Sequence, residues 1–186
     1  MKKMLIETKL QILAEAPNLL EDLLAEIPND LLKIRRIKGK WSIHEHACHL
    51  AEAQRMIIGR FKRFKQEKNP TFVPYLPGTT VPDDNLAKMD LPEQLADFRA
   101  NRQVMVDLLR SYTEADWSNE GSHPEYKQIN ALLWLRHVLM HDHFHMYRIE
   151  ELWLTTEEYL RKPNYCLLYT SPSPRDATLS RMPSSA

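Results

Sequence analysis

The strongest constraint on the fold is the helical spacing of apolar residues in four long stretches. Apolar side chains recur every three or four positions over residues 5–27, 43–66, 91–112 and 130–159. This spacing places them along one side of an α-helix. No stretch shows the strict alternation that is typical of a strand, and no internal repeat is present. Since four amphipathic helices bury their stripes by packing together, the sequence predicts an all-α fold, a four-helix bundle.

Helix boundaries are marked by residues that satisfy or replace free backbone N–H groups. Ser42 followed by Glu45 is a capping box at the start of the second helix. Pro92 stands in the first turn of the third helix, and Asn130 is a cap for the last. Pro17 interrupts the first stretch. The first helix is therefore either kinked there or followed by a second helix that starts at Pro17.

The same spacing predicts which side chains face the core and which face solvent. His44 is expected to face outward, His49 to lie at the edge of the apolar face, and His123 to be exposed. The residues expected to point inward are Leu5, Leu10, Leu13, Leu19, Leu20, Leu23, Leu24 and Ile27; Ile43, Ala47, Leu50, Ile57, Phe61 and Phe64; Leu95, Phe98, Met105, Leu108 and Leu109; and Trp134, Val138, Phe144 and Leu152.

Two connections between the helices contain helix-breaking residues. Residues 69–90 include four prolines and a glycine, which predicts a long irregular crossover between the second and third helices. Loops of this length often cover a functional site, but a solvated crossover between distant helices is an equally open alternative. Residues 113–129 are polar and contain Gly121 and Pro124, so they are expected to be irregular.

The last helix carries an unusual stripe of histidines. His137, His141 and His145 are spaced i, i+4, i+8 and lie on one face, whereas His143 points roughly the other way. The rest of that face is apolar, which marks it as inward. Buried imidazoles need partners, and a pair at i, i+4 can be satisfied by hydrogen bonds or by one divalent metal ion. The spacing alone leaves both alternatives open.

Composition excludes several classes of protein. The formal net charge is zero and 43% of residues are hydrophobic, so the sequence indicates neither a nucleic-acid-binding surface nor disorder. No signal peptide and no membrane-spanning stretch is visible, so a cytoplasmic location is the default expectation. Cys48 and Cys166 are the two cysteines, which implies no disulfide framework.

The last 21 residues, 166–186, are not expected to belong to the folded domain. CLLYTSPSPRD, residues 166–176, is the translation of a transposase-type sequencing adapter, and SRMPSSA, residues 180–186, matches the part of such an adapter beyond its index. We therefore expect residues 166–186 to be adapter read-through, residues 1–165 to form one domain, and the natural C-terminus to be missing. The alternative is a genuine disordered tail.

Two motifs in one chain carry a resemblance to a known family. The first is Gly39-Lys40-Trp41-Ser42-Ile43 leading to His49-Leu50-Ala51, and the second is His141-Asp142-His143-Phe144-His145 followed by Arg148-Ile149-Glu150. Together, at this separation, they resemble the DinB-like (DinB/YfiT) superfamily. The resemblance covers nearly all of residues 1–165.

This resemblance implies a metal centre within the bundle. In the family, one histidine of the second helix and two of the last helix bind a divalent metal, usually zinc or nickel. By position, these ligands are His49, His141 and His145, with His46 and His137 as the substitutes. Many relatives have glutamine where this chain has Arg148, so the resemblance says less about the substrate than about the metal.

Three histidines with a vacant fourth position are typical of a catalytic zinc site. The family resemblance implies either hydrolysis or transfer of a low-molecular-weight thiol, with metal-activated water or thiol attacking a small electrophilic substrate. It also implies a homodimer. The competing hypothesis is a non-catalytic, stress-related metal-binding protein, and the third is a dimerising bundle with no metal at all.

Five further side chains are candidates for a role beside the metal. Cys48 is either a nucleophile or ligand or a small core residue. Glu45 and Glu52 could orient an imidazole or accept a proton, although Glu45 already serves the capping box. Arg60 could bind an anionic substrate group or extend along the surface with its charge in solvent. Tyr75, in the crossover, could reach over the metal.

Overall fold

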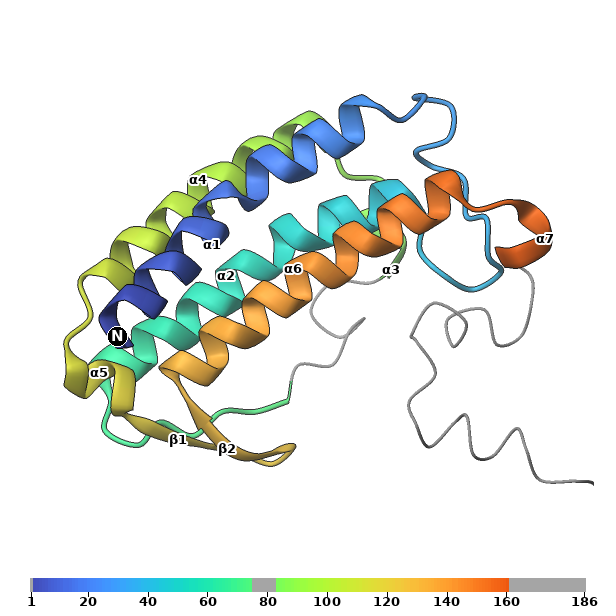
Figure 1. The fold of residues 1–186 in the computed structure, drawn as a ribbon. Helices are drawn as coiled ribbons and strands as arrows, with labels where there is room; N and C mark the ends of the chain where they lie inside the picture. The colour runs from blue at the N-terminus through green and yellow to red at the C-terminus, as the bar shows by residue number, and fades with distance from the viewer. Residues whose placement is uncertain (1, 75–82, 161–186) are drawn as a thin grey trace, which may run out of the picture.

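The computed structural model describes residues 2–74 and 83–160, and it confirms a bundle of four long helices (Figure 1). The segments that contain Tyr75 and the predicted adapter-derived tail lie outside the described residues. The long helices are α1 (Lys2–Ala25), α2 (Ile43–Gln66), α4 (Leu91–Arg110) and α6 (Ala131–Leu154); the short elements are α3 (Asp83–Leu86), α5 (Glu114–Ser118), α7 (Glu157–Leu160) and the strands β1 (Glu120–His123) and β2 (Tyr126–Asn130).

Each long helix packs against two others. Helices α1 and α2 lie on opposite corners, and each contacts both α4 and α6 (Figure 1). The neighbours α2 and α4 run in the same direction, because Arg55 meets Asp97 and Lys65 meets Ser111 further along both helices. A helix of 24 residues is about 36 Å long, so the chain must return along the bundle before α4 begins. The predicted crossover makes this return.

The predicted caps are present. The Ser42 side chain accepts a hydrogen bond from the Glu45 backbone N–H, and the Glu45 carboxylate accepts one from the Ser42 N–H, which completes the capping box. Asn130 accepts a hydrogen bond from the Leu133 N–H and caps α6. Pro17 lies inside α1, which continues as one helix. No helix in the described part of the chain is long and apolar enough to cross a membrane.

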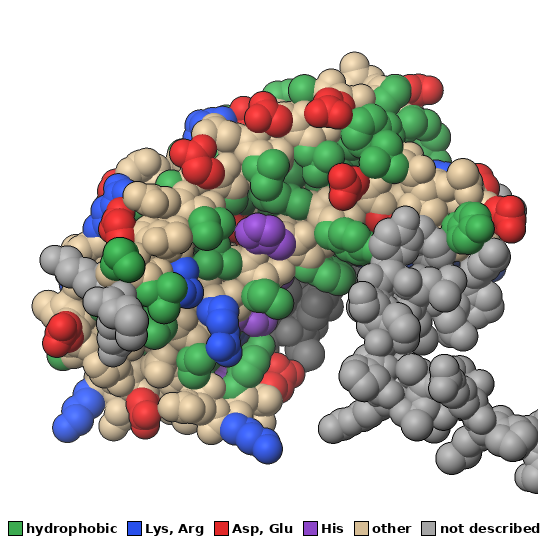
Figure 2. Space-filling model, viewed as in Figure 1, with side chains coloured by type: hydrophobic (Ala, Val, Ile, Leu, Met, Phe, Trp, Pro, Cys, Tyr) green, Lys and Arg blue, Asp and Glu red, His purple; other side chains and the backbone are tan. Residues whose placement is uncertain are grey.

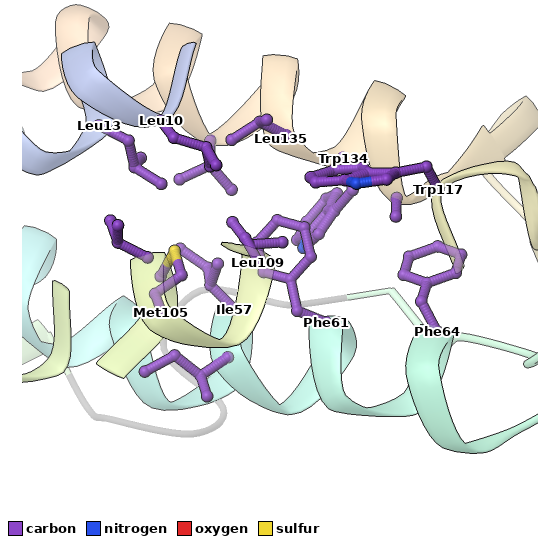
Figure 3. Packing of buried hydrophobic residues seen from close by; sticks show 14 of the residues in the cluster. Leu10, Leu13, Ile57, Phe61, Phe64, Met105, Leu109, Trp117, Trp134 and Leu135 are labelled. Carbon is purple, nitrogen blue, oxygen red and sulfur yellow. The ribbon is translucent and has the colours of Figure 1, made fainter. Parts of the chain in front are cut away.

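The core forms two clusters along the bundle. One lies toward the end that carries α5 and the two strands, and the other lies toward the α1–α2 connection. In the first cluster, side chains from all four long helices interdigitate (Figure 3). Most residues expected to point inward are buried there or in the second cluster, which confirms the helical spacing as a guide. Labelled members of the first cluster are Leu10, Leu13, Ile57, Phe61, Phe64, Met105, Leu109, Trp117, Trp134 and Leu135.

Three of the inward predictions are wrong. Leu5, Leu19 and Phe144 are 55%, 52% and 56% exposed. They lie on α1 and α6, whose apolar stripes are wider than the surface covered by their two neighbours. A single helix's periodicity gives the direction of a stripe, but the neighbours decide how much of it is covered.

The expectation that residues 113–129 are irregular is wrong. They contain α5 and an antiparallel hairpin in which Glu120 pairs with Asn130 and Gly121 with Ile129. Both faces of the hairpin are largely exposed, so its sequence lacks the alternation by which half-buried strands are recognised. At Gly121 an added Cβ would lie 2.8 Å from the Pro70 carbonyl oxygen, which explains the glycine.

Two histidines expected at the surface are buried. His44 is 2% exposed because residues 83–90 cover the start of α2, where the Leu86 and Met89 backbones hydrogen-bond to the imidazole. His123 is 7% exposed because the hairpin turns its ring against Tyr126. Both side chains are covered by segments outside the long helices, which the helical spacing does not describe.

Candidate metal centre

The structure brings the three predicted ligands together. Helices α2 and α6 run antiparallel, so His49 of α2 faces His141 and His145 of α6. The three imidazoles each offer a ring nitrogen, and these nitrogens all lie within 4.8 Å of one another. His49 and His145 are each 6% exposed. No other group of three potential ligands of this kind occurs among the described residues.

The spacing of His49 and His141 fits a metal ion of the size of zinc. The Nε2 atoms of His49 and His141 are 3.2 Å apart. Zinc–nitrogen bonds of 2.0–2.1 Å in a tetrahedral arrangement hold two ligand nitrogens about 3.3 Å apart. The donor set consists of imidazoles alone, which suits zinc, nickel and other first-row metals. These residues therefore fit the metal that the family resemblance implies.

The two substitute histidines occupy different places. The Nδ1 atom of His46 lies 2.8 Å from Nδ1 of His145, so His46 contacts a predicted ligand and leaves the other ring nitrogen of His145 for a metal. His137 instead stacks on Trp134, with ring centroids 4.7 Å apart and planes 10° apart. A histidine that holds the second nitrogen of a ligand fixes the ligand's orientation and tautomer.

Burial keeps these histidines neutral. Loss of hydration, followed by the nearby His141 and His46, lowers the pKa of His49 to about 3. Burial, followed by the charge of Arg148, lowers the pKa of His46 to about 4. The pKa of His145 is lowered by burial and by the other imidazoles. Because a metal binds the neutral imidazole, His49 and His145 are already in their binding form at neutral pH.

Other candidate residues are turned away from the three imidazoles. Glu45 is held by its cap and by Arg35, whose Nε donates to the carboxylate at 2.8 Å. Cys48 is fully buried, 3.5 Å from the His44 ring, and burial raises the pKa of its thiol to about 12. This thiol stays protonated at neutral pH and behaves as a core residue. Glu52 is half-buried and does not line the cavity described next.

A cavity of about 340 Å³ opens beside the imidazoles. His49, His141 and His145 form one part of its wall, while Arg60 and Tyr126 form another. Figure 2 shows histidine side chains at the surface of the bundle among hydrophobic and basic ones. The remaining lining residues are Trp41, Ala53, Met56, Ile57, His123, Glu125, Trp134, His137, Val138 and Phe144.

A buried ion pair lies behind the histidines. Arg102 of α4 and Asp142 of α6 approach to 2.8 Å across the bundle, both with side chains 1% exposed. They meet at the distance of an ion pair without hydrogen-bond alignment. The sequence analysis missed this pair. The signal was present, because Arg102 stands between Phe98 and Met105 on the buried stripe of α4.

Comparison with known proteins gives a family match and a match of the fold. The model of the DinB superfamily matches residues 12–149. The structure is similar to that of YfiT from Bacillus subtilis, described as "a probable metal-dependent hydrolase with an unusual four-helix bundle topology", with a TM-score of 0.71 and 24% sequence identity. The match covers 78% of this chain and 84% of YfiT, and it shows a shared fold. No curated protein matches the sequence.

Proposed function

Because the chain belongs to the DinB superfamily, we propose that it is a divalent-metal-dependent enzyme whose metal is held by His49, His141 and His145. When bound, such a metal lowers the pKa of a water or thiol at its open position and so provides a nucleophile at neutral pH. The substrate in this proposal is a small electrophilic molecule that enters the adjacent cavity.

The observation that carries this proposal is the position of the three imidazoles on a cavity wall. Structural zinc sites are closed by four protein ligands, whereas catalytic sites keep one position open. Among the described residues, the group of potential ligands has three members, and the cavity reaches all three. This arrangement favours catalysis over a purely structural site.

Residues around the three histidines orient the predicted ligands and exclude water from them. His46 orients His145 through their Nδ1 contact. The Trp41 ring lies 4.8 Å from the His49 ring and 6.0 Å from the His145 ring and shields the cluster from solvent. Arg148 forms a buried ion pair with Glu151, so its charge is compensated within α6.

We propose zinc or nickel as the metal and the cytoplasm as the location.

This proposal allows two reactions, hydrolysis and the transfer of a thiol. Hydrolysis is supported by the likeness to YfiT, which is described as a probable metal-dependent hydrolase. Transfer of a low-molecular-weight thiol to an electrophile uses the same open position. Assays of metal-loaded protein with model esters and amides, and with thiols against a panel of electrophiles, separate the two. Background rates in both assays would favour the non-catalytic metal-binding alternative.

Metal content is the first test. Elemental mass spectrometry on protein purified without a polyhistidine tag should find about one metal ion per chain, because one three-histidine site binds one ion. The double variant His141→Ala/His145→Ala should lose it. His143→Ala is the matched control, since His143 is exposed on the same helix and contacts the Leu139 carbonyl oxygen. Equal metal content in the double variant and the control would overturn the ligand assignment.

We also propose that the protein is a homodimer, with its interface on the outer side of α1 and α6. These adjacent helices expose Ile12, Leu19, Met140 and Leu154. Figure 2 shows hydrophobic side chains gathered over this side of the bundle. Patches of this kind on a protein surface mark association sites. Sedimentation equilibrium of the wild type and of Met140→Glu/Leu154→Glu tests this: a dimer that dissociates in the variant is expected.

A further inference from the structure

The end of the cavity away from the predicted metal ligands is built differently from the end beside them. Arg60 and His49 are both on α2, eleven residues apart, which places them on the same face about 16 Å apart along the helix axis. Both line the same cavity. A molecule that contacts both ends must therefore be elongated.

Hydrogen-bond donors gather at the Arg60 end. The Arg60 guanidinium lies over the Trp134 ring, 4.6 Å from its centroid, and donates from Nη2 to the Val73 carbonyl oxygen at 2.8 Å. A guanidinium carries five N–H donors, so this bond leaves others for a ligand. Stacking on Trp134 holds the group in place and reduces the entropy lost on binding.

A second donor at this end lacks a partner. Trp134 is 3% exposed and lines the cavity, and its Nε1–H has no hydrogen-bond acceptor among the described residues. This nitrogen has almost no exposed surface, so the Trp134 ring supports the Arg60 guanidinium rather than donating to a ligand in the cavity. The imidazole of His137 stacks on the Trp134 ring and also lines the cavity.

We propose that this end of the cavity is a subsite for a carboxylate, held by the Arg60 guanidinium where it stacks on Trp134, on an elongated substrate or thiol whose other end reaches the histidines. A carboxylate is favoured over a dianionic phosphate because Arg60 is the cation lining the cavity there, while Glu125 adds a negative charge at the same end. This inference rests on the proposed function only for what binds at the histidine end.

Thiols of graded length test the subsite. Zinc-loaded protein is titrated with ω-mercaptocarboxylic acids and with ω-mercaptoalcohols of equal length, and the dissociation constants are measured by calorimetry. At lengths that span the cavity the acid should bind about 10- to 100-fold more tightly than the alcohol, since a charge-assisted hydrogen bond contributes that much. At the shortest lengths the advantage should be absent. Equal affinities at every length would overturn the subsite.

Variants on α2 identify the residue responsible. Arg60→Met should abolish the advantage of the acids, and Arg60→Lys should keep part of it because the charge is retained. Arg55→Met is the matched control: Arg55 lies on the same helix, its side chain is 75% exposed, and it does not line the cavity. An advantage that survives in a folded Arg60→Met, verified by circular dichroism, would overturn the assignment to Arg60.

The same titrations in metal-free protein separate this inference from the proposed function. Thiols that bind equally with and without zinc, while long acids keep their advantage over alcohols and lose it in Arg60→Met, would support the subsite and contradict metal activation of a thiol. Zinc-dependent binding with no advantage for the acids would support the metal chemistry and overturn the subsite.

Discussion

Two clusters of buried polar side chains flank α6, and they differ in how their charges are compensated. On one side, Asp142 meets Arg102, so a negative and a positive charge compensate each other inside the core. On the other side, His141 and His145 meet His49 and His46, which are all bases. The charges of the first cluster balance within the chain, although none of its side-chain nitrogen and oxygen atoms has a hydrogen-bond partner among the described residues. The second is made of imidazoles, with the Asp142 carboxylate 3.9 Å from His141 Nδ1, and nitrogen donors backed by a carboxylate are suited to a cation.

The two clusters also differ in access. The Arg102–Asp142 pair is closed off from solvent, whereas the histidines border a cavity. A closed and charge-compensated pair contributes to specifying which helices meet, while neutral imidazoles at a cavity wall are available to a ligand. The side chains at adjacent positions 141 and 142 thus lie in different surroundings, one at the cavity wall and one in the core, because successive residues of a helix point about 100° apart.

The sharpest way to test this comparison is to break the ion pair. Arg102→Leu removes the positive charge and leaves Asp142 buried without its partner, which should lower the free energy of unfolding by about 3–5 kcal/mol in denaturant titrations. Replacing both residues, Arg102→Met with Asp142→Leu, should recover most of this loss because no charge is left uncompensated.

Arg99→Leu is the matched control for this prediction. Arg99 is on the same helix and pairs with Glu21, but these side chains are 51% and 37% exposed. Its loss should change the free energy of unfolding little, since exposed pairs are screened by water. An Arg102→Leu protein as stable as Arg99→Leu would show that the buried pair does not hold the bundle together.

Acid should weaken the metal-free protein through the other cluster. The pKa values of His49 and His46 in the folded state, about 3 and about 4, lie below the ordinary 6.5 of an unfolded histidine. The unfolded chain therefore binds more protons between these values. Stability is fully present above pH about 6.5 and is lost as the pH falls, by about 1.4 kcal/mol per pH unit for each histidine.

Urea titrations after chelation, at a series of pH values from 7.5 downward, measure this slope. His49→Gln should reduce it, because one titrating imidazole is removed from the cluster. His143→Ala should leave it unchanged, since that imidazole is exposed. A free energy of unfolding that stays constant between pH 7 and pH 5 would contradict the neutral state of the buried histidines.

Removing the contact that orients His145 should weaken metal binding without abolishing it. His46→Ala deletes the imidazole 2.8 Å from His145 Nδ1, and loss of such a partner typically reduces metal affinity about 10- to 100-fold. Competition with a chromophoric chelator measures the change. His44→Ala is the control, because His44 is buried on the other side of the same turn beside Cys48. Equal affinities in the two variants would remove His46 from this role.

The smallest effect is expected at the start of α2, which presents His46 and His49 to α6. Ser42→Ala removes the side-chain acceptor for the Glu45 backbone N–H and should cost about 1 kcal/mol of stability. Ser42→Asn should restore most of it, since asparagine caps equally well. Thermal unfolding of the three proteins tests this, and a lower melting temperature in Ser42→Asn than in Ser42→Ala would contradict the capping role.

Local patterns carried most of what could be predicted about the fold. Helix spacing, the capping box at Ser42 and the cap at Asn130 depend on residues within one or two turns, and all three are confirmed. The β1–β2 hairpin was missed because its exposed strands have no alternation to read. The burial of His44 was missed because a segment distant in the sequence covers it.

In the candidate site, too, some features are set within one helix and others by the packing of two helices. The stripe of His141 and His145 on one helix face is a property of the sequence, since i, i+4 spacing sets it without reference to any other helix. The family resemblance predicted that His49 would join them, whereas the contact of His46 with His145 and the place of Arg60 in the same cavity depended on the antiparallel packing of α2 against α6. The sequence by itself therefore determined the helices and the side chains each one presents. The tertiary structure alone decided which of those side chains meet, because contacts between helices depend on how their apolar stripes pack together.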